Sequence, residues 1–303
     1  MKFSVWPSFA RPWNELAEFA RATEAQGWHG LWYADHYMSD RADGEPSDEP
    51  ALECWAGLAG IAAITTRLRL GTLVSPTTMH HPALLAKRAA TVDRMSNGRV
   101  ILGMGAGWQI NEHKAYGVEL FEKKDRVDRF EEALMIVSSL LSTPRTTFTG
   151  KHFQITDAPC EPKPVQSPLP ILVGTSGPRM SRIVARTAQE WNIWGTPETV
   201  ANASRVMDVA CEKEARDPAT MRRSTQALVF IVDDPVTAEK IRAAAPPDRS
   251  LIGSPNYLAE QISAYKASGI DEFILPDFTL GATPEARRAA YDRVWDEVVP
   301  NVA

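Results

Sequence analysis

The 303-residue sequence predicts an α/β protein of the (β/α)8 TIM-barrel class, and three observations favour this fold. Short apolar runs alternate with longer amphipathic segments along most of the chain, as expected of parallel strands joined by helical crossovers. There are eight such strand–helix units, the number that closes into a barrel. The turn after the first apolar run reads SFARPW and lacks the GxGxxG motif of the competing doubly wound sheet.

The first four units follow one another regularly. Strands are predicted at 2–6, 30–34, 68–74 and 99–105. Helices are predicted at 13–26, 51–64, 82–95 and 124–141. Gly27 is placed to end the first helix and Pro82 to open the third. The fourth helix carries apolar residues at a helical period, which indicates one face packed on the core.

A Pro-rich stretch at 144–168 interrupts the alternation. It contains the hairpin-like segment RTTFTGKHFQI and is interpreted as an insertion within one domain that spans 1–303. The alternation then resumes, with strands predicted at 170–174, 190–194, 226–232 and 272–276. The matching helices are predicted at 178–189, 197–215, 255–268 and 283–299.

Composition excludes several classes of protein. The formal net charge is −5 and charges of both signs are interspersed, whereas a nucleic-acid binder carries a basic excess. No apolar run approaches the ~20 residues of a membrane span, and MKFSVWPSF has too short an apolar core for a signal peptide. The cysteines Cys54, Cys160 and Cys211 are far apart and without CxxC spacing, which is typical of reduced thiols in a cytoplasm.

Unusual residues gather where predicted strands end, which is where TIM-barrel enzymes place their active sites. The second strand ends in Asp35 and His36. The third and fourth end in Leu73, Val74, Ser75 and in Gly105, Ala106, Gly107, Trp108. Each piece also has a structural explanation, since an Asp–His pair can cap a helix and glycines can simply form a turn. The strand beginnings carry ordinary turn signals such as SNG at 96–98, so one working face is predicted.

Two later strands end in glycine and hydroxyl residues that precede a proline. These residues are Gly174, Thr175, Ser176 and Gly177 before Pro178, and Gly195 and Thr196 before Pro197. Proline suits the first position of a helix, and a helix N-terminus binds phosphate through its free N–H groups. The alternative is a plain capped helix, but the repeated device favours phosphate. No metal site is expected, because the first strand has no His-x-His pair and His80 and His81 are sequence neighbours.

The chain resembles the luciferase-like monooxygenase superfamily. The similarity lies in GLWYADHYM, in LGTLVSPTTMHHPALLAKRAATVDRMSNGRVILGMGAGWQINEHKAYG, and in EWNIWGTP and DEFILPDF, in that order. Within the superfamily it is most similar to oxidoreductases that depend on the 5-deazaflavin coenzyme F420. The resemblance implies a bacterial luciferase-like α/β barrel with an insertion region.

The resemblance also implies roles for the strand-end residues. His36 would lie over the deazaflavin ring and exchange a proton, for which an imidazole that titrates near neutrality is suited, while Asp35 positions it or the cofactor. The Leu73–Val74 bond would be a non-prolyl cis peptide whose bulge contacts the back of the ring. Residues 105–107 would let backbone approach the ring, and 174–177 with 195–196 would hold the phosphate. Arg179 or Lys163 would meet the charged cofactor tail.

One departure from the family concerns the substrate. Sugar-phosphate dehydrogenases of this family have a glutamate directly after the glycine turn and a tryptophan a few residues after the histidine. This chain has Trp108 and Asp40 there. Trp108, with Trp32, Trp6 and Trp194 at other strand ends, predicts an apolar substrate pocket, although some of these rings could belong to the core. Glu112 and His113 are either further acid–base groups or the start of a solvated helix.

Three functions remain open at this point. The first is an F420-dependent oxidoreductase that moves a hydride between the coenzyme and a small, largely apolar substrate. The second is a monooxygenase that uses reduced FMN from a separate reductase together with O2. The third is a cofactor-storage or sensing barrel without catalysis. A homodimer is expected from the family.

Overall fold

The computed structural model describes all residues from 1 to 303. Its main strands are β1 (Lys2–Trp6), β2 (Gly30–Tyr33), β3 (Arg69–Thr72), β4 (Ser75–Pro76), β5 (Val100–Gly105), β8 (Ile171–Gly174), β9 (Glu190–Trp194), β10 (Arg222–Gln226) and β13 (Glu272–Pro276). Its main helices are α1 (Trp13–Gln26), α2 (Cys54–Ile64), α3 (Pro82–Ser96), α5 (Lys123–Ser142), α6 (Pro178–Thr187), α7 (Pro197–Lys213), α9 (Pro255–Ala267) and α10 (Pro284–Arg293).

The strands form one nine-stranded sheet in the order β3-β2-β1-β13-β10-β9-β8-β5-β4, and β3 pairs with β5 as well. That additional pairing returns the order to its start, so the connectivity is that of the predicted (β/α)8 barrel. The chain divides into two compact units. The N-terminal unit comprises Phe9–Thr175 and Thr187–Gln189, and the C-terminal unit comprises Met1–Ser8, Ser176–Arg186 and Glu190–Ala303.

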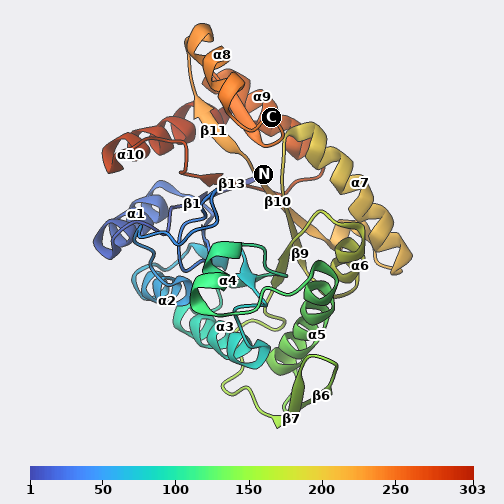
Figure 1. Cartoon of the computed structure of the whole chain (residues 1–303). Coiled ribbons are helices and arrows are strands. Elements are labelled where there is room, and N and C mark those ends of the chain that lie inside the picture. The colour runs from blue at the N-terminus through green and yellow to red at the C-terminus, as the bar shows by residue number, and fades with distance from the viewer. The chain divides into compact units, whose positions relative to one another are not determined.

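In the N-terminal unit, β2, β3, β5 and β8 pair in parallel and bury an aliphatic core. Leu31 is the register partner of Leu70, which in turn faces Val100. Leu102 faces Ile171 in the next pairing. Helices α1, α2, α3 and α5 lie side by side along the outside of these strands (Figure 1). The predicted strand at 68–74 is shortened to β3, and the short β4 follows just beyond it. Helix α2 begins later than predicted because the Glu53 side chain caps it.

Arg99 ties the helix ends of this unit together at the start of β5. Its guanidinium donates to the carbonyl oxygens of Ala62, Thr65 and Leu68 at 2.7–3.0 Å, and its Nε donates to Ser96 O at 2.7 Å. Burial lowers the pKa of Arg99 from its usual value. The last carbonyls of α2 and α3 have no partner within their own helices, so one cation satisfies both ends.

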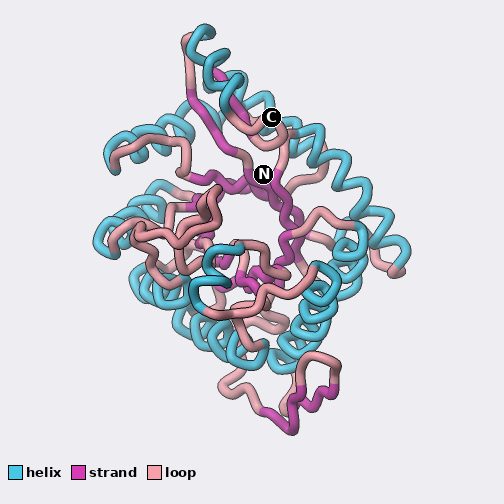
Figure 2. The backbone as a smooth tube through the Cα atoms, in the orientation of Figure 1, coloured by secondary structure: helices cyan, strands magenta, loops and turns pink.

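The predicted insertion is an antiparallel hairpin of β6 (Thr146–Thr149) and β7 (Gln154–Ala158), which projects beyond α5 in Figure 2. Buried Asp93 of α3 fastens the segment that leads back to the barrel. Its carboxylate accepts the backbone N–H groups of Val165 and Gln166 at 2.7 and 3.1 Å and the Gln166 side-chain amide at 2.7 Å. Asp93 therefore ties the end of the insertion to the helical layer.

In the C-terminal unit, β1 pairs with β13, β13 with β10, and β10 with β9. The predicted strand at 226–232 is wrong as a barrel strand, because the barrel uses β10, whose sequence RRSTQ is polar. Polar side chains are satisfied inside the unit: the Asn192 amide donates to Gln226 Oε1 at 2.7 Å, and Thr225 Oγ1 donates to Ile193 O at 2.7 Å.

The apolar residues after β10 form a separate small sheet. Strand β11 (Leu228–Ile231) pairs in parallel with β12 (Ser250–Gly253), and α8 (Pro235–Ala244) joins them. These elements appear in orange in Figure 1. The last predicted helix ends at Arg293 and continues as a wider turn at Val294–Val298 and a tight turn at Val299–Asn301.

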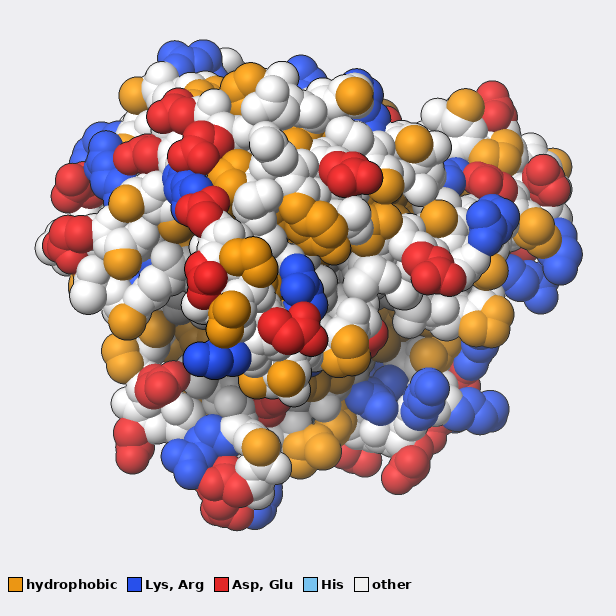
Figure 3. All heavy atoms as spheres, turned by 90° about the horizontal axis from the view of Figure 1, so that it is seen from above, with side chains coloured by type: hydrophobic (Ala, Val, Ile, Leu, Met, Phe, Trp, Pro, Cys, Tyr) orange, Lys and Arg blue, Asp and Glu red, His pale blue; other side chains and the backbone are white.

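No helix combines the length and the apolar character that crossing a bilayer requires. On the face shown in Figure 3, acidic and basic side chains are interspersed with apolar ones. This surface agrees with the mixed charge pattern of the sequence.

Candidate functional site

The predicted strand-end residues of the N-terminal unit lie along one edge of its sheet. Ser75 is the register partner of Met104, and Met104 is that of Val173. Gly105 and Gly174, one residue further on, therefore end their strands at the level of Pro76. Asp35, after β2, reaches the same edge because its carboxylate accepts a hydrogen bond from the Ser75 hydroxyl.

Asp35 is the centre of a buried polar chain. Its Oδ2 accepts from Ser75 Oγ and from His80 Nε2, the latter at 2.9 Å. Arg88 Nη1 lies 2.9 Å from His80 Nδ1 and can only donate, so the His80 hydrogen is on Nε2. Burial alone would raise the pKa of Asp35, but the hydrogen bonds that its carboxylate accepts from His80 and Ser75 hold it below its usual value. Asp35 is thus an anchored carboxylate, and His80 supports it.

His36 is paired with a carboxylate that the sequence left ambiguous. Its Nδ1 lies 2.8 Å from Oε1 of Glu112, and Oε2 of Glu112 accepts the Tyr37 N–H at 2.9 Å. The Glu112 side chain is 1% exposed, whereas that of His36 is 15% exposed. Nε2 of His36 has no hydrogen-bond partner in the structure. The ring therefore keeps one nitrogen available at the strand-end edge.

Glu112 belongs to a short helix, α4 (Ile110–Tyr116), which the sequence offered only as one of two explanations for Glu112 and His113. Buried Gln109 and Asn111 hold the loop after β2: Gln109 donates to Met38 O at 2.9 Å, and Asn111 donates to Ser39 O at 2.9 Å. Glu112 adds a third contact between α4 and this loop, because its carboxylate contacts His36 and Tyr37. The sequence signal was the run QINEH directly after the glycine turn, but seven residues are too few for a helical period to be recognised.

His113, the other ambiguous residue, has a structural role. Its Nδ1 donates to Gln109 O at 2.6 Å, and its Nε2 lies 2.8 Å from Thr78 Oγ1. Both nitrogens are occupied and the side chain is buried. Gly107, which precedes Trp108, has φ +91°, and a Cβ there would overlap Thr78. The glycine turn at 105–107 and His113 thus pack around one threonine.

The four tryptophans of the predicted aromatic pocket have different surroundings. Trp108 is 57% exposed and meets the His36 ring edge-on at a centroid distance of 5.5 Å. Trp32 is buried against Gly71 and belongs to the core. In the C-terminal unit, Trp6 lies 5.6 Å from Trp194 between ring centroids. The core explanation therefore holds for Trp32, while Trp108 borders the histidine.

The Leu73–Val74 peptide is cis, as the resemblance implied. The Val74 side chain packs against glycine positions of β5 and β8. A Cβ added at Gly105 would lie 2.6 Å from Val74 Cγ2, and one at Gly174 would lie 3.5 Å from Val74 Cγ1. Val74 therefore fills a space that side chains from these two strands would otherwise take, and the strand ends around it are largely bare backbone.

The remaining predicted cradle residues belong to the C-terminal unit, apart from Gly174 and Thr175. Ser176 and Gly177 precede α6, and no atom lies within 4 Å of a Cβ built on Gly177. Thr196 caps α7, where its hydroxyl accepts the Thr199 N–H at 3.5 Å, and the Gly195 carbonyl accepts the Tyr265 hydroxyl at 2.5 Å. Capping thus accounts for Thr196 by itself, and a side chain at position 177 would meet no neighbouring atom.

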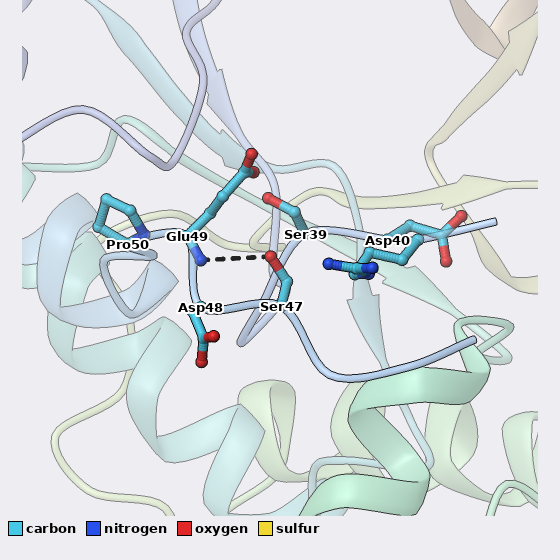
Figure 4. Close-up of a pocket in the computed structure, with 7 residues that line it drawn as sticks. Ser39, Asp40, Ser47, Asp48, Glu49 and Pro50 are labelled. Atoms are coloured by element: carbon cyan, nitrogen blue, oxygen red, sulfur yellow. Dashed lines mark hydrogen bonds between the residues drawn. The ribbon is translucent and has the colours of Figure 1, made fainter. Parts of the chain in front are cut away.

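A polar hollow of about 500 Å³ lies in the loop after β2. It is lined by Ser39, Asp40, Arg41, Ser47, Asp48, Glu49 and Pro50. In Figure 4 the carboxylates of Asp48 and Glu49 point to opposite sides of the segment, and the Glu49 N–H donates to Ser47 Oγ at 3.3 Å. Asp40, at the position where sugar-phosphate dehydrogenases were expected to have tryptophan, is part of this solvent-facing wall.

Two other charged groups lie away from these strand ends. Asp125, Asp128 and His152 bring possible metal ligands within 4.8 Å of one another, but Lys151 pairs with Asp125 at 3.0 Å and Lys124 with Asp128 at 4.0 Å. Lys163, suggested for the cofactor tail, donates to Leu140 O at 2.9 Å near the C-terminal end of α5. Lys163 is thus engaged by the helical layer.

Comparisons with known proteins identify the family of the chain. A family model described as luciferase-like monooxygenase matches residues 1–245. The chain is 37% identical over 175 residues to an F420-dependent glucose-6-phosphate dehydrogenase of Kineococcus radiotolerans, covering 57% of this chain and 50% of that protein. It is 28% identical over 290 residues to the F420-dependent hydroxymycolic acid dehydrogenase of Mycobacterium tuberculosis, covering 93% and 76%. The chain spans about half the length of several curated relatives that it matches.

Among solved structures, the chain is similar to an F420-dependent secondary alcohol dehydrogenase in complex with an F420–acetone adduct. The TM-score is 0.83 at 19% sequence identity, and the match covers 100% of both chains. At this identity the likeness supports the barrel fold.

Proposed function

Because the chain belongs to the luciferase-like monooxygenase family, we propose that it is an F420-dependent oxidoreductase that transfers a hydride between the coenzyme and a small, largely apolar organic molecule. The observation that carries this proposal is His36 at the end of β2, held by a buried carboxylate and keeping Nε2 available. Two similar relatives named as F420-dependent dehydrogenases support the choice of coenzyme.

The N-terminal unit offers a surface that suits a planar ring. Val74 and the bare backbone of Gly105 and Gly174 form a floor with few side chains, and Asp35 and Ser75 lie beside it at the same strand ends. His36 and Leu73–Val74 follow neighbouring strands, β2 and β3. We assign Asp35, residues 73–75 and residues 105–108 to the ring. We assign the phosphate to residues 174–177 with Gly195 and Thr196, because Ser176 and Gly177 precede the first residue of α6 and Thr196 caps α7.

The protein's own contribution to the reaction would be proton transfer and orientation. When bound, the deazaflavin supplies or accepts the hydride. His36 would use Nε2 to take the hydroxyl proton from a substrate that is being oxidised, or to return it to a carbonyl oxygen that is being reduced. Asp35 would act through its fixed position, since Ser75 and His80 already occupy its Oδ2.

The substrate class follows from the surroundings of His36. Trp108 presents an exposed aromatic edge to the ring, and Phe9 lies on its other flank at a centroid distance of 6.4 Å. Position 108 is tryptophan, whereas sugar-phosphate dehydrogenases of the family are expected to have glutamate there. The chain therefore lacks that carboxylate next to His36. A secondary alcohol or ketone with an apolar body fits these flanks better than glucose 6-phosphate does.

The test uses a panel of secondary alcohols and ketones, with glucose 6-phosphate as comparator, and follows the absorbance of F420. We expect turnover with members of the panel, loss of at least ~100-fold in His36→Ala, and unchanged F420 affinity in that variant. His29→Ala, at the opposite end of β2, is the matched control and should keep full activity. Turnover with glucose 6-phosphate alone would contradict the substrate class. F420 binding without turnover of any compound would favour the storage or sensing function.

The protein is further proposed to be a cytoplasmic homodimer. All three cysteines are free and buried, which suits a reducing compartment, and the dimer is an expectation from the family. Light scattering of the purified protein measures the oligomeric state directly, and a monomeric mass would contradict the dimer.

A further inference from the structure

We propose that Glu112 is a positioning residue that fixes the tautomer of His36, so that Nδ1 carries the hydrogen and Nε2 faces the reacting molecule as a bare lone pair. That Nε2 takes part in a reaction rests on the proposed function, whereas the tautomer follows from the contacts of Glu112 alone.

The two oxygens of Glu112 have one donor each. Oε2 accepts the backbone N–H of Tyr37 at 2.9 Å, and Oε1 lies 2.8 Å from His36 Nδ1. An ionised carboxylate only accepts hydrogen bonds, so Nδ1 must be the donor. A neutral imidazole has a single N–H, and this bond therefore leaves Nε2 unprotonated.

The carboxylate is itself rigidly held. Glu112 is 1% exposed, its backbone N–H donates to Asn111 Oδ1 at 2.9 Å, and its neighbours Gln109 and Asn111 bind the loop that carries His36. When Nε2 takes a proton, the resulting imidazolium lies against a buried negative charge. The same side chain thus orients the ring and stabilises its charged form.

Two buried histidines near the same strand ends differ from His36 in what their rings contact. His80 and His113 both have two occupied nitrogens and are buried. His36 has one occupied nitrogen and a partly exposed ring.

The test is the 15N spectrum of the imidazole nitrogens in the whole protein, in wild type and in Glu112→Gln, at a pH where the ring is neutral. In the variant the amide oxygen must stay with the Tyr37 N–H, a donor that cannot move. The amide NH2 group then faces Nδ1, and the hydrogen shifts to Nε2. We expect Nδ1–H for His36 in wild type and Nε2–H in Glu112→Gln.

Catalysis provides the second readout. In Glu112→Gln we expect kcat to fall by roughly 10²–10⁴-fold, the contribution typical of a general acid–base group, with KM and F420 affinity little changed. Glu119→Gln, an exposed neighbour beyond α4, is the control and should leave both readouts unchanged. Glu112→Asp should keep the Nδ1–H tautomer.

The outcomes separate this inference from the proposed function. An Nε2–H tautomer in wild type, or an unchanged tautomer in Glu112→Gln, would overturn it. If Glu112→Gln does not fold, the wild-type spectrum still decides the tautomer. If the tautomers are as expected but F420 does not bind, the role of Glu112 in holding the ring stands and the choice of coenzyme fails.

Discussion

Three histidines near the strand ends of the N-terminal unit differ in how many of their ring nitrogens have a hydrogen-bond partner. His80 is locked between Arg88 and Asp35, and His113 between Thr78 and a backbone carbonyl. His36 alone of the three keeps a nitrogen open. The division of roles therefore follows from which groups surround each ring, since the residue type is the same in all three.

Asp35 should make the stability of the protein sensitive to acid. Its pKa is lower in the folded chain than in the unfolded one, so the ionised carboxylate stabilises the fold above the unfolded-state value, ~4. This stabilisation is lost as the pH falls through the folded-state pKa. We expect Asp35→Asn to cost about 2–4 kcal/mol near neutral pH. Denaturant titrations should show the difference from wild type shrinking below pH ~4, and a difference independent of pH would contradict this account.

Gly105 should be needed to keep Val74 in place. A Cβ at position 105 would lie 2.6 Å from Val74 Cγ2, and a β-branched side chain has little freedom to move aside. We expect Gly105→Ala to cost about 1–3 kcal/mol and to weaken F420 binding. Gly57→Ala, where the new Cβ would meet Tyr33 at an ordinary 3.6 Å, is the control. Unchanged F420 affinity in Gly105→Ala would argue against Val74 as the floor of the ring site.

At the level of elements, the loop after β2 owes its conformation to the start of α4. Asn111 donates to the carbonyl oxygens of Ser39 and Glu45, at 2.9 and 3.3 Å. We expect Asn111→Ala to raise hydrogen exchange in residues 37–45 while strands β2 and β5 keep their protection. Unchanged exchange in the loop would show that other contacts hold it.

Most elements could be predicted because their apolar residues follow the period of a strand or a helix. Strand β10 could not, since its polar side chains are satisfied by partners distant in sequence, such as Asn192, which donates to Gln226 of β10. Partners that are distant in sequence also limited the prediction of the site. The sequence placed Asp35 and His36 at one edge, but Glu112 lies 76 positions from His36, and only the fold brings them together.

At the level of the whole molecule, the thiols report on integrity of the fold. Cys54, Cys160 and Cys211 are buried and free, and burial raises the pKa of each thiol. We therefore expect no reaction with a thiol reagent in the native protein and reaction of all three in denaturant. Rapid labelling of the native protein would contradict the packing described for these residues.

The most direct test of the coenzyme assignment is an equilibrium titration of F420 fluorescence with the purified protein, run in parallel with FMN. We predict saturable quenching of F420 and no comparable binding of FMN. Tight FMN binding without F420 binding would contradict the account and favour a monooxygenase instead.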